Sequence, residues 1–158
     1  MDQIGTAKEQ ALYFLTFRSR SSAEIRQYLQ RKDHSSSIQD EVVAWLRHLG
    51  YVDDVRFALQ WIEDRCRTNP MGARRLAQEL WQKGIPQSII DEAVDHFNAT
   101  VDEAALARQL AAKQALRYRG QDPAAVARKL AGFLGRRGFR LEDIRRAISE
   151  TVENTEIS

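Results

Sequence analysis

The stretches LWQKGIPQSIIDEAV (80–94) and LGRRGFRLEDIRRAI (134–148) each place a glycine and an apolar residue between two segments of helical spacing. Adding 51 to residues 25–43 superposes them on 76–94 without a gap, and adding a further 54 reaches 130–148. Apolar positions coincide in the three copies: Ile25, Leu76 and Leu130; Leu29, Leu80 and Leu134; Val42, Ala93 and Ala147; Val43, Val94 and Ile148. Because the register holds through the elbows, the pattern predicts three copies of one helical unit.

Helical spacing of apolar residues continues through almost the whole chain, without the alternation typical of strands. Turn signals predict nine helices, over residues 7–18, 21–32, 37–49, 53–68, 72–83, 87–97, 101–118, 123–137 and 141–153. We therefore predict an all-α protein of three tandem three-helix, helix-turn-helix-like repeats in an elongated, curved arrangement. The predicted repeats are residues 1–52, 53–99 and 100–158, the last with an acidic C-terminal tail.

The adjacent aspartates Asp53 and Asp54 admit two interpretations, a metal or acid/base pair and the start of a helix. They follow Gly50 and precede an apolar helical stripe, which favours capping of free N–H groups in the first turn. The same reasoning predicts capping boxes at Ser21-x-x-Glu24 and Thr100-x-x-Glu103. It also predicts left-handed residues at the ends of helices, namely Gly50, Gly84 and Gly138.

Composition favours a folded, non-exported chain: 43% of its 158 residues are hydrophobic, and no apolar run approaches the ~18 residues of a membrane span. Cys66 is the only cysteine, so an internal disulfide is impossible, and we predict a cytoplasmic protein. No histidine or cysteine spacing typical of a metal site and no phosphate loop occurs, so we predict no enzyme and no cofactor. Cys66 lies between two arginines that could lower its pKa, but no base is placed beside it, which favours a structural thiol.

Four segments, in order, resemble the bacterial RecX family, regulators of the RecA recombinase. They are RSRSSAEIRQYLQRK, GYVDDVRFALQWIEDR, MGARRLAQELWQKGI and KLAGFLGRRGF. The resemblance covers about residues 7 to 150 and departs at Pro86 and at the serine tract 35–37. It implies three tandem three-helix units and a monomer that lies in the groove of the RecA–DNA filament, restraining its growth, strand exchange and ATPase. It also implies weaker DNA binding, mostly without sequence specificity, and roles in recombination, DNA repair and the SOS response.

Charge suggests where an anionic partner would bind. Residues 72–146 carry fourteen basic and nine acidic side chains, whereas residues 1–71 carry ten of each. A solvated helical surface remains the alternative, with pairs such as Glu142 and Arg146 forming salt bridges. The candidate contacts for DNA or RecA are Arg74, Arg75, Lys83, Arg128, Lys129, Arg136, Arg137, Arg140, Arg145 and Arg146.

Trp81 has no equivalent in the other copies, where the register places Gln30 and Gly135. We expect it to pack between units, with an exposed anchor for a partner as the alternative; Trp45 and Trp61 lie on apolar stripes and are expected in the core. Two other functions remain open for the whole chain. One is a sequence-specific transcriptional regulator with tandem helix-turn-helix units, and the other is a purely protein-binding scaffold indifferent to DNA and salt.

Overall fold

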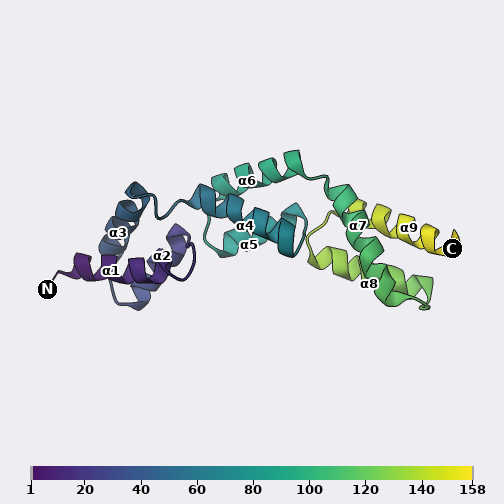
Figure 1. Ribbon diagram of the computed structural model, residues 1–158, viewed down its shortest axis with the longest axis horizontal. Helices are drawn as coiled ribbons and strands as arrows, with labels where there is room; N and C mark the ends of the chain where they lie inside the picture. Colours follow the sequence, from purple (N-terminus) through teal and green to yellow (C-terminus); the bar gives the residue numbers. More distant parts are fainter. Residues whose placement is uncertain (1, 158) are drawn as a thin grey trace. The chain divides into compact units, whose positions relative to one another are not determined.

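The computed structural model describes residues 2–157, and the side chains of residues 2–154. Over that range all regular structure is helical (Figure 1). The elements are α1 (Gln3–Leu15), α2 (Ser22–Arg31), α3 (Ser36–His48), α4 (Asp54–Thr68), α5 (Ala73–Gln82), α6 (Gln87–Thr100), α7 (Glu103–Ala115), the 3-10 turn η1 (Leu116–Tyr118), α8 (Pro123–Arg136) and α9 (Leu141–Ile157). The all-α prediction is confirmed, and nine α-helices lie close to the nine predicted ranges.

The repeat register is confirmed by burial. The positions shared by the three copies are fully buried at Leu29, Leu80 and Leu134, and Val42, Ala93 and Ala147 are at most 3% exposed. In the first helix of each repeat a small residue is also fully buried, namely Ala7, Ala58 and Ala107, although the third lies 49 residues after the second and so falls outside the 54-residue offset. A side chain of this size lets a helix approach its neighbours closely, and the sequence analysis did not recognise this position.

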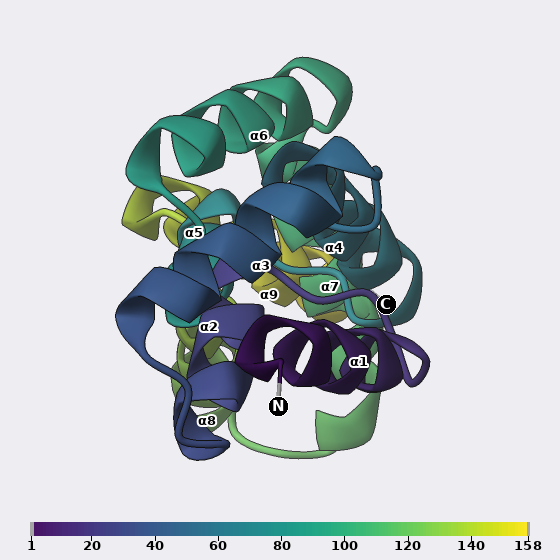
Figure 2. The ribbon, with the colours of Figure 1, turned by 90° about the vertical axis from the view of Figure 1, so that its left-hand side faces the viewer.

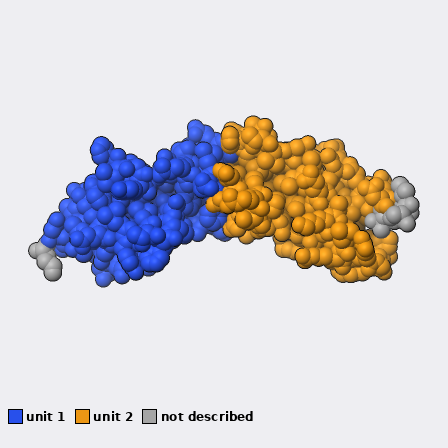
Figure 3. All heavy atoms as spheres, in the orientation of Figure 1, with its two compact units in different colours: residues 1–61, 80–93 blue, residues 62–79, 94–158 orange. Residues whose placement is uncertain are grey.

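The chain forms two compact units that divide within the second repeat (Figure 3). Unit 1 contains residues 1–61 and 80–93, and unit 2 contains residues 62–79 and 94–158. In unit 1, α1, α2 and α3 pack around a core that also takes in Val52; this bundle faces the viewer in Figure 2. In unit 2, α7 packs on α8 and α9 around Ala107, Leu134, Phe139 and Ile144.

An aspartate starts the first helix of every repeat. Asp2 accepts a hydrogen bond from the Ile4 N–H, Asp53 from the Arg56 N–H and Asp102 from the Ala105 N–H, each at 3.1 Å. These carboxylates satisfy N–H groups that the first turn leaves free and suit the helix dipole. The capping interpretation of Asp53 is therefore confirmed, and Asp2 explains why α1 begins at residue 3 instead of residue 7.

The capping box is confirmed at Ser21 and Glu24 but is wrong at Thr100 and Glu103. Ser21 accepts from the Glu24 N–H, and Glu24 accepts from the Ser21 N–H, each at 3.1 Å. Thr100 is instead the last residue of α6, and the N-cap of α7 is Asp102. The sequence pattern failed because Glu103 is buried and turned toward another helix.

The acid that follows the capping aspartate joins one repeat to the preceding one. In unit 1 Asp54 is 7% exposed and accepts a 2.8 Å hydrogen bond from the Ser22 N–H, at the first turn of α2. In unit 2 Glu103 accepts a 2.7 Å hydrogen bond from the Ala73 N–H, at the first turn of α5. The second helix of the last repeat, α8, begins with Pro123, which has no N–H to satisfy.

We call the contact of Asp54 with α2, within unit 1, junction 1, and the contact of Glu103 with α5, within unit 2, junction 2. An elbow glycine completes each junction. Gly84 and Gly138 have φ of +75° and +80°, as predicted, and so does Gly50 at +79°. A Cβ on Gly84 would lie 2.2 Å from the Cβ of Ala23, and one on Gly138 would lie 2.3 Å from the backbone nitrogen of Arg75. Each junction thus places the elbow of one repeat against the second helix of the repeat before it.

Candidate nucleic-acid interface

Two of the candidate cations have structural roles at equivalent places in the junctions. The Lys83 carbonyl accepts a 2.6 Å hydrogen bond from the Ser21 hydroxyl at junction 1. The Arg137 carbonyl accepts a 2.7 Å hydrogen bond from the Gly72 N–H at junction 2. The Arg137 guanidinium also donates to the Pro70 carbonyl at 2.9 Å and lies 4.7 Å from the centre of the Phe133 ring. Burial lowers the pKa of Arg137, because the low-dielectric surroundings disfavour its charge.

Four other candidates are engaged with side chains of the protein. Arg75 Nε lies 3.4 Å from Glu79, Arg140 lies 4.0 Å from Glu103, and Arg146 lies 3.9 Å from Glu142, as the salt-bridge alternative predicted for that pair. Lys129 donates to Gln121 and lies over Tyr118. The acidic partners Glu79 and Glu103 are buried, but the four cations themselves remain exposed or half-buried, so they can still bind a partner.

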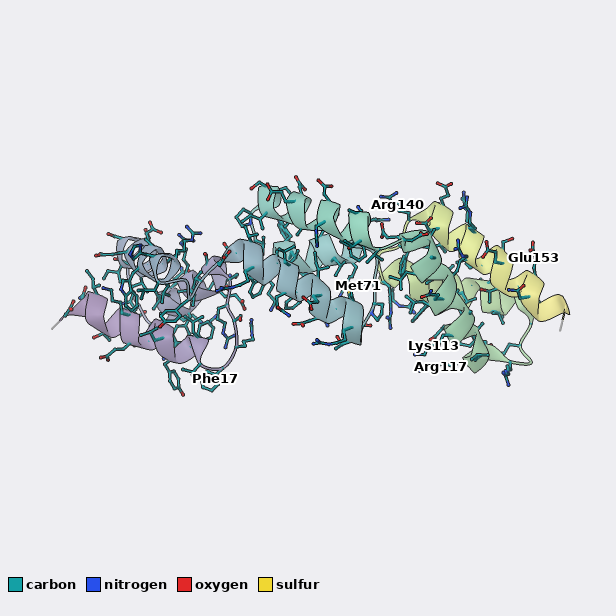
Figure 4. All side chains as sticks on the ribbon, turned by 45° about the horizontal axis from the view of Figure 1, so that its top comes forward. Phe17, Met71, Lys113, Arg117, Arg140 and Glu153 are labelled. Atoms are coloured by element: carbon teal, nitrogen blue, oxygen red, sulfur yellow. The ribbon has the colours of Figure 1, made fainter. Side chains whose placement is uncertain are left out.

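The remaining candidates, Arg74, Arg128, Arg136 and Arg145, are exposed and form no ion pair within the described side chains. Lys113 and Arg117, which the sequence analysis did not select, are also exposed cations one helical turn apart at the end of α7 and in η1 (Figure 4). Their i, i+4 spacing could have identified them. Arg140 lies at the other end of unit 2's helical bundle, just before α9 (Figure 4).

A cationic cleft within unit 2 brings together three of the candidates. Arg75 contributes from α5, and Arg136 and Arg137 contribute from the end of α8 and its elbow. The cleft has a volume of about 440 Å³, and its other lining residues are Asn69, Met71, Gln78, Glu79 and Gly135. Glu79 is nearly buried and is also bound by Arg65 at 2.9 Å, so the cleft retains a positive balance.

The tryptophans differ from the prediction. Trp81 is 68% exposed, so packing between units is wrong for this side chain. It follows the buried Leu80 by one residue, and one residue is a rotation of about 100° around a helix, which places it on the solvent side. Trp45 and Trp61 are only partly buried; Lys8 lies over the first at 4.6 Å and Lys83 over the second at 5.2 Å.

No constellation for catalysis emerges from the side chains that the structure describes. Burial, followed by the charge of Glu63, raises the pKa of Cys66, which agrees with the expected structural thiol and not with an activated nucleophile. No three His, Cys, Asp or Glu side chains in the described part of the chain are grouped to hold a metal ion. None of the described helices is long and apolar enough to cross a membrane.

The fold and the site together define a tandem three-helix-repeat protein with a cationic cleft within unit 2. Domain models of RecX match the chain three times and in order: the first three-helix domain at residues 7–46, the second at 53–94 and the third at 102–148. The regulatory protein RecX of Streptomyces coelicolor is 31% identical over 98% of this chain and 84% of its own length. The chain belongs to the RecX family of regulatory proteins.

Other relatives and solved structures agree. The regulatory protein RecX of Pelodictyon phaeoclathratiforme is 33% identical over 87% of this chain and 84% of its own. That of Geobacillus kaustophilus is 33% identical over 98% of this chain, which spans 57% of that relative's length. The crystal structure of RecX from Lactobacillus salivarius has the same fold, with a TM-score of 0.79 at 22% identity over 94% of this chain and 96% of that one. A second crystal structure of a regulatory protein RecX has a TM-score of 0.77 at 27% identity over 97% and 72%.

Proposed function

We propose that this protein is a non-enzymatic regulator that binds filaments of the RecA recombinase on DNA and lowers their recombinase and ATPase activity. In that role it modulates recombination and DNA repair and acts as a monomer. The observation that carries the proposal is the match to all three RecX domains, in order, between residues 7 and 148. RecA as the partner comes from the resemblance of the sequence motifs to the RecX family.

The surface supports contact with a polyanion. Among the candidates, the exposed side chains of Arg145 and Arg146 are adjacent on α9, the last helix of the third repeat. Several weak contacts on one chain reinforce one another, because the second contact forms at high effective concentration. A filament of repeating subunits and phosphates offers such contacts many times, which favours it over a compact ligand.

The direct test is a titration of the DNA-dependent ATPase and the strand exchange of RecA with the full chain. We expect both activities to fall. Inhibition well below one chain per recombinase subunit indicates a block at filament ends, and near-stoichiometric inhibition indicates occupation of the groove. Unchanged activities at a large excess of a chain that still binds DNA would refute the proposal.

A pair of matched variants tests the surface. Arg145→Ala with Arg146→Ala removes two adjacent cations from α9, and we expect it to weaken inhibition. Arg31→Ala with Lys32→Ala removes two adjacent exposed cations from the end of α2 and serves as the control, with inhibition unchanged. Equal loss in both variants would mean that total charge, and not the α9 surface, is responsible.

The transcriptional-regulator alternative makes a different prediction for bare DNA. A reader of base edges discriminates its site from other DNA by ~4 kcal/mol or more. A protein that contacts phosphates binds all sequences similarly, and its affinity falls as salt rises because counterions are released. Affinity measured on unrelated duplexes at several salt concentrations therefore distinguishes the two.

A further inference from the structure

The residues of the cationic cleft at junction 2 have equivalents at junction 1, in the register of the preceding repeats, and we call these equivalents the twin site. The 51- and 54-residue offsets pair Glu24 with Arg75, and Lys83 with Arg137. The same register pairs Trp81 with Gly135, and Gln82 with Arg136. Four neighbouring side chains therefore differ in charge or size between two sites of the same backbone design.

In the twin, the chain supplies its own anion. The Glu24 carboxylate is bound by Arg18 and lies 3.8 Å from the Lys83 ammonium. Burial opposes ionisation of Glu24, but the hydrogen bonds from Arg18 and from the Ser21 N–H, with the charges of Arg18 and Lys83, outweigh it and lower its pKa. Junction geometry of this kind thus holds an ionised group against the cation at the elbow.

At junction 2 this internal anion is replaced by a cation. Arg75 stands where the twin has Glu24, so the described side chains form no carboxylate pair with Arg137. The only acid of the cleft, Glu79, is already held by Arg65 at 2.9 Å and by Arg75 at 3.4 Å. Among the described residues, Arg137 is therefore a partly buried guanidinium whose charge is stabilised by a carbonyl and a ring face alone.

Gly135 lines the cleft without a side chain. A Cβ built on Gly135 has no atom within 4 Å, whereas the twin carries the large side chain of Trp81 at this place. The cavity of about 440 Å³ falls within the size range of sites for small ligands, so it has room for a sugar–phosphate group. Arginine is suited to phosphate because its planar guanidinium donates two parallel hydrogen bonds.

We propose that the cleft formed by Arg75, Arg136 and Arg137 binds a phosphodiester group of a nucleic-acid backbone, which supplies the negative charge that Glu24 supplies at junction 1. This inference rests on the proposed function and deepens it, since it assigns the DNA contact to one cleft. Phosphates occur at every nucleotide, so the cleft contributes affinity without sequence preference. Arg136 comes from the exposed end of α8 and lines the cleft.

The test compares Gly135→Trp, which gives the cleft the side chain of its twin, with Gly135→Ala. Neither substitution meets a neighbouring atom at the Cβ, and circular dichroism verifies that both variants fold. Binding of a labelled mixed-sequence single-stranded oligonucleotide is measured by fluorescence anisotropy at several salt concentrations. We expect Gly135→Ala to bind as the unchanged protein does and Gly135→Trp to bind on the order of tenfold more weakly, the effect of about one lost charge-assisted contact.

A second variant tests the phosphate contact by the salt dependence of the binding affinity. Each phosphate contact to a single strand contributes ~0.7 to the slope of log affinity against log salt. Arg136→Gln, which introduces the residue of the twin, should lower the slope by about that amount. Arg31→Gln, on the exposed end of α2, should leave it unchanged. Equal affinity and slope in Gly135→Trp and Gly135→Ala would overturn the proposal.

Two competitors identify the ligand. If polyglutamate loses affinity in Gly135→Trp while the oligonucleotide does not, the cleft serves an acidic protein and the proposal is wrong. If inorganic phosphate at constant ionic strength displaces the oligonucleotide at equimolar concentration, free phosphate is the ligand, which also overturns it. RecA is absent from these assays, so failure to inhibit RecA would refute the proposed function without affecting this result.

Discussion

The neighbours Asp53 and Asp54 offer a sharp test of how the repeats are joined, because one caps its own helix and the other caps a helix of the preceding repeat. Asp54 is 7% exposed, and its carboxylate is 2.8 Å from the N–H of Ser22, which is itself buried. Asp54→Ala leaves that N–H without an acceptor. The other partner of Asp54 is the exposed Arg47, at 3.8 Å, and this pair adds little.

The magnitudes follow from these contacts. A hydrogen bond to a charged group contributes ~1.5–3 kcal/mol, so we expect Asp54→Ala to lower the free energy of unfolding by that amount. Asp53→Ala removes an ordinary exposed N-cap and should cost about 1 kcal/mol. The costs expected for the two single substitutions overlap. The decisive quantity is therefore the coupling energy between Asp54 and Ser22, which is the deviation of a double variant from additivity.

Ser22→Pro provides that coupling, because it removes the N–H at the first position of α2; α8 likewise begins with a proline, Pro123. Ser21 already has φ −75° and ψ 162°, a conformation suited to the residue before a proline. We expect Ser22→Pro and Asp54→Ala together to cost less than the sum of the two single changes, by ~1–2 kcal/mol. Ser22→Pro and Asp53→Ala should be additive.

Urea unfolding followed by circular dichroism measures the free energy of unfolding of the unchanged protein, of each single variant and of the two double variants. For a chain of this length each kcal/mol also moves the melting temperature by ~2–4 °C. If Asp54→Ala and Ser22→Pro add within ~0.5 kcal/mol, the carboxylate does not act through the α2 terminus and the reasoning about the junction is wrong.

Three further predictions test the core, the elbows and the loss of stability at low pH. Leu80→Ala should lower the free energy of unfolding by ~2–5 kcal/mol, because Leu80 is fully buried and shared by all repeats; a neutral result contradicts the register. Gly138→Ala should cost clearly more than Gly50→Ala, since both have positive φ but only the Cβ at 138 meets another backbone; equal melting temperatures would contradict this. Burial opposes the ionisation of Glu24, but its pKa is lowered by Arg18, the Ser21 N–H and Lys83. Ionised Glu24 therefore stabilises the fold above the ordinary carboxyl pKa, and this stabilisation is lost as pH falls through the lowered pKa. Glu24→Gln should reduce the loss of unfolding free energy at acid pH. If the dependence on pH is unchanged, the Glu24–Arg18 pair is not its cause.

Local periodicity determined most of the architecture from the sequence alone. The spacing of Leu29, Leu80 and Leu134 predicted equivalent buried positions, because a helix presents the same face every third or fourth residue whatever it packs against. The elbow glycines were predictable for a similar reason, since a left-handed residue is needed wherever such a helix ends. Asp53 could be assigned as a cap because its hydrogen bond spans only three residues.

Contacts between distant segments were decided only by the tertiary structure. Asp54 and Glu103 bind N–H groups that are 32 and 30 residues away, and no local spacing encodes such a partner. For the same reason Thr100-x-x-Glu103 was misread as a capping box. The exposure of Trp81 could have been inferred from its place one residue after the core position Leu80, but whether another segment covers that side of α5 was decided only by the tertiary structure. The separation of structural from available arginines likewise required the packing of the elbows, because identical guanidinium groups differ only in what surrounds them.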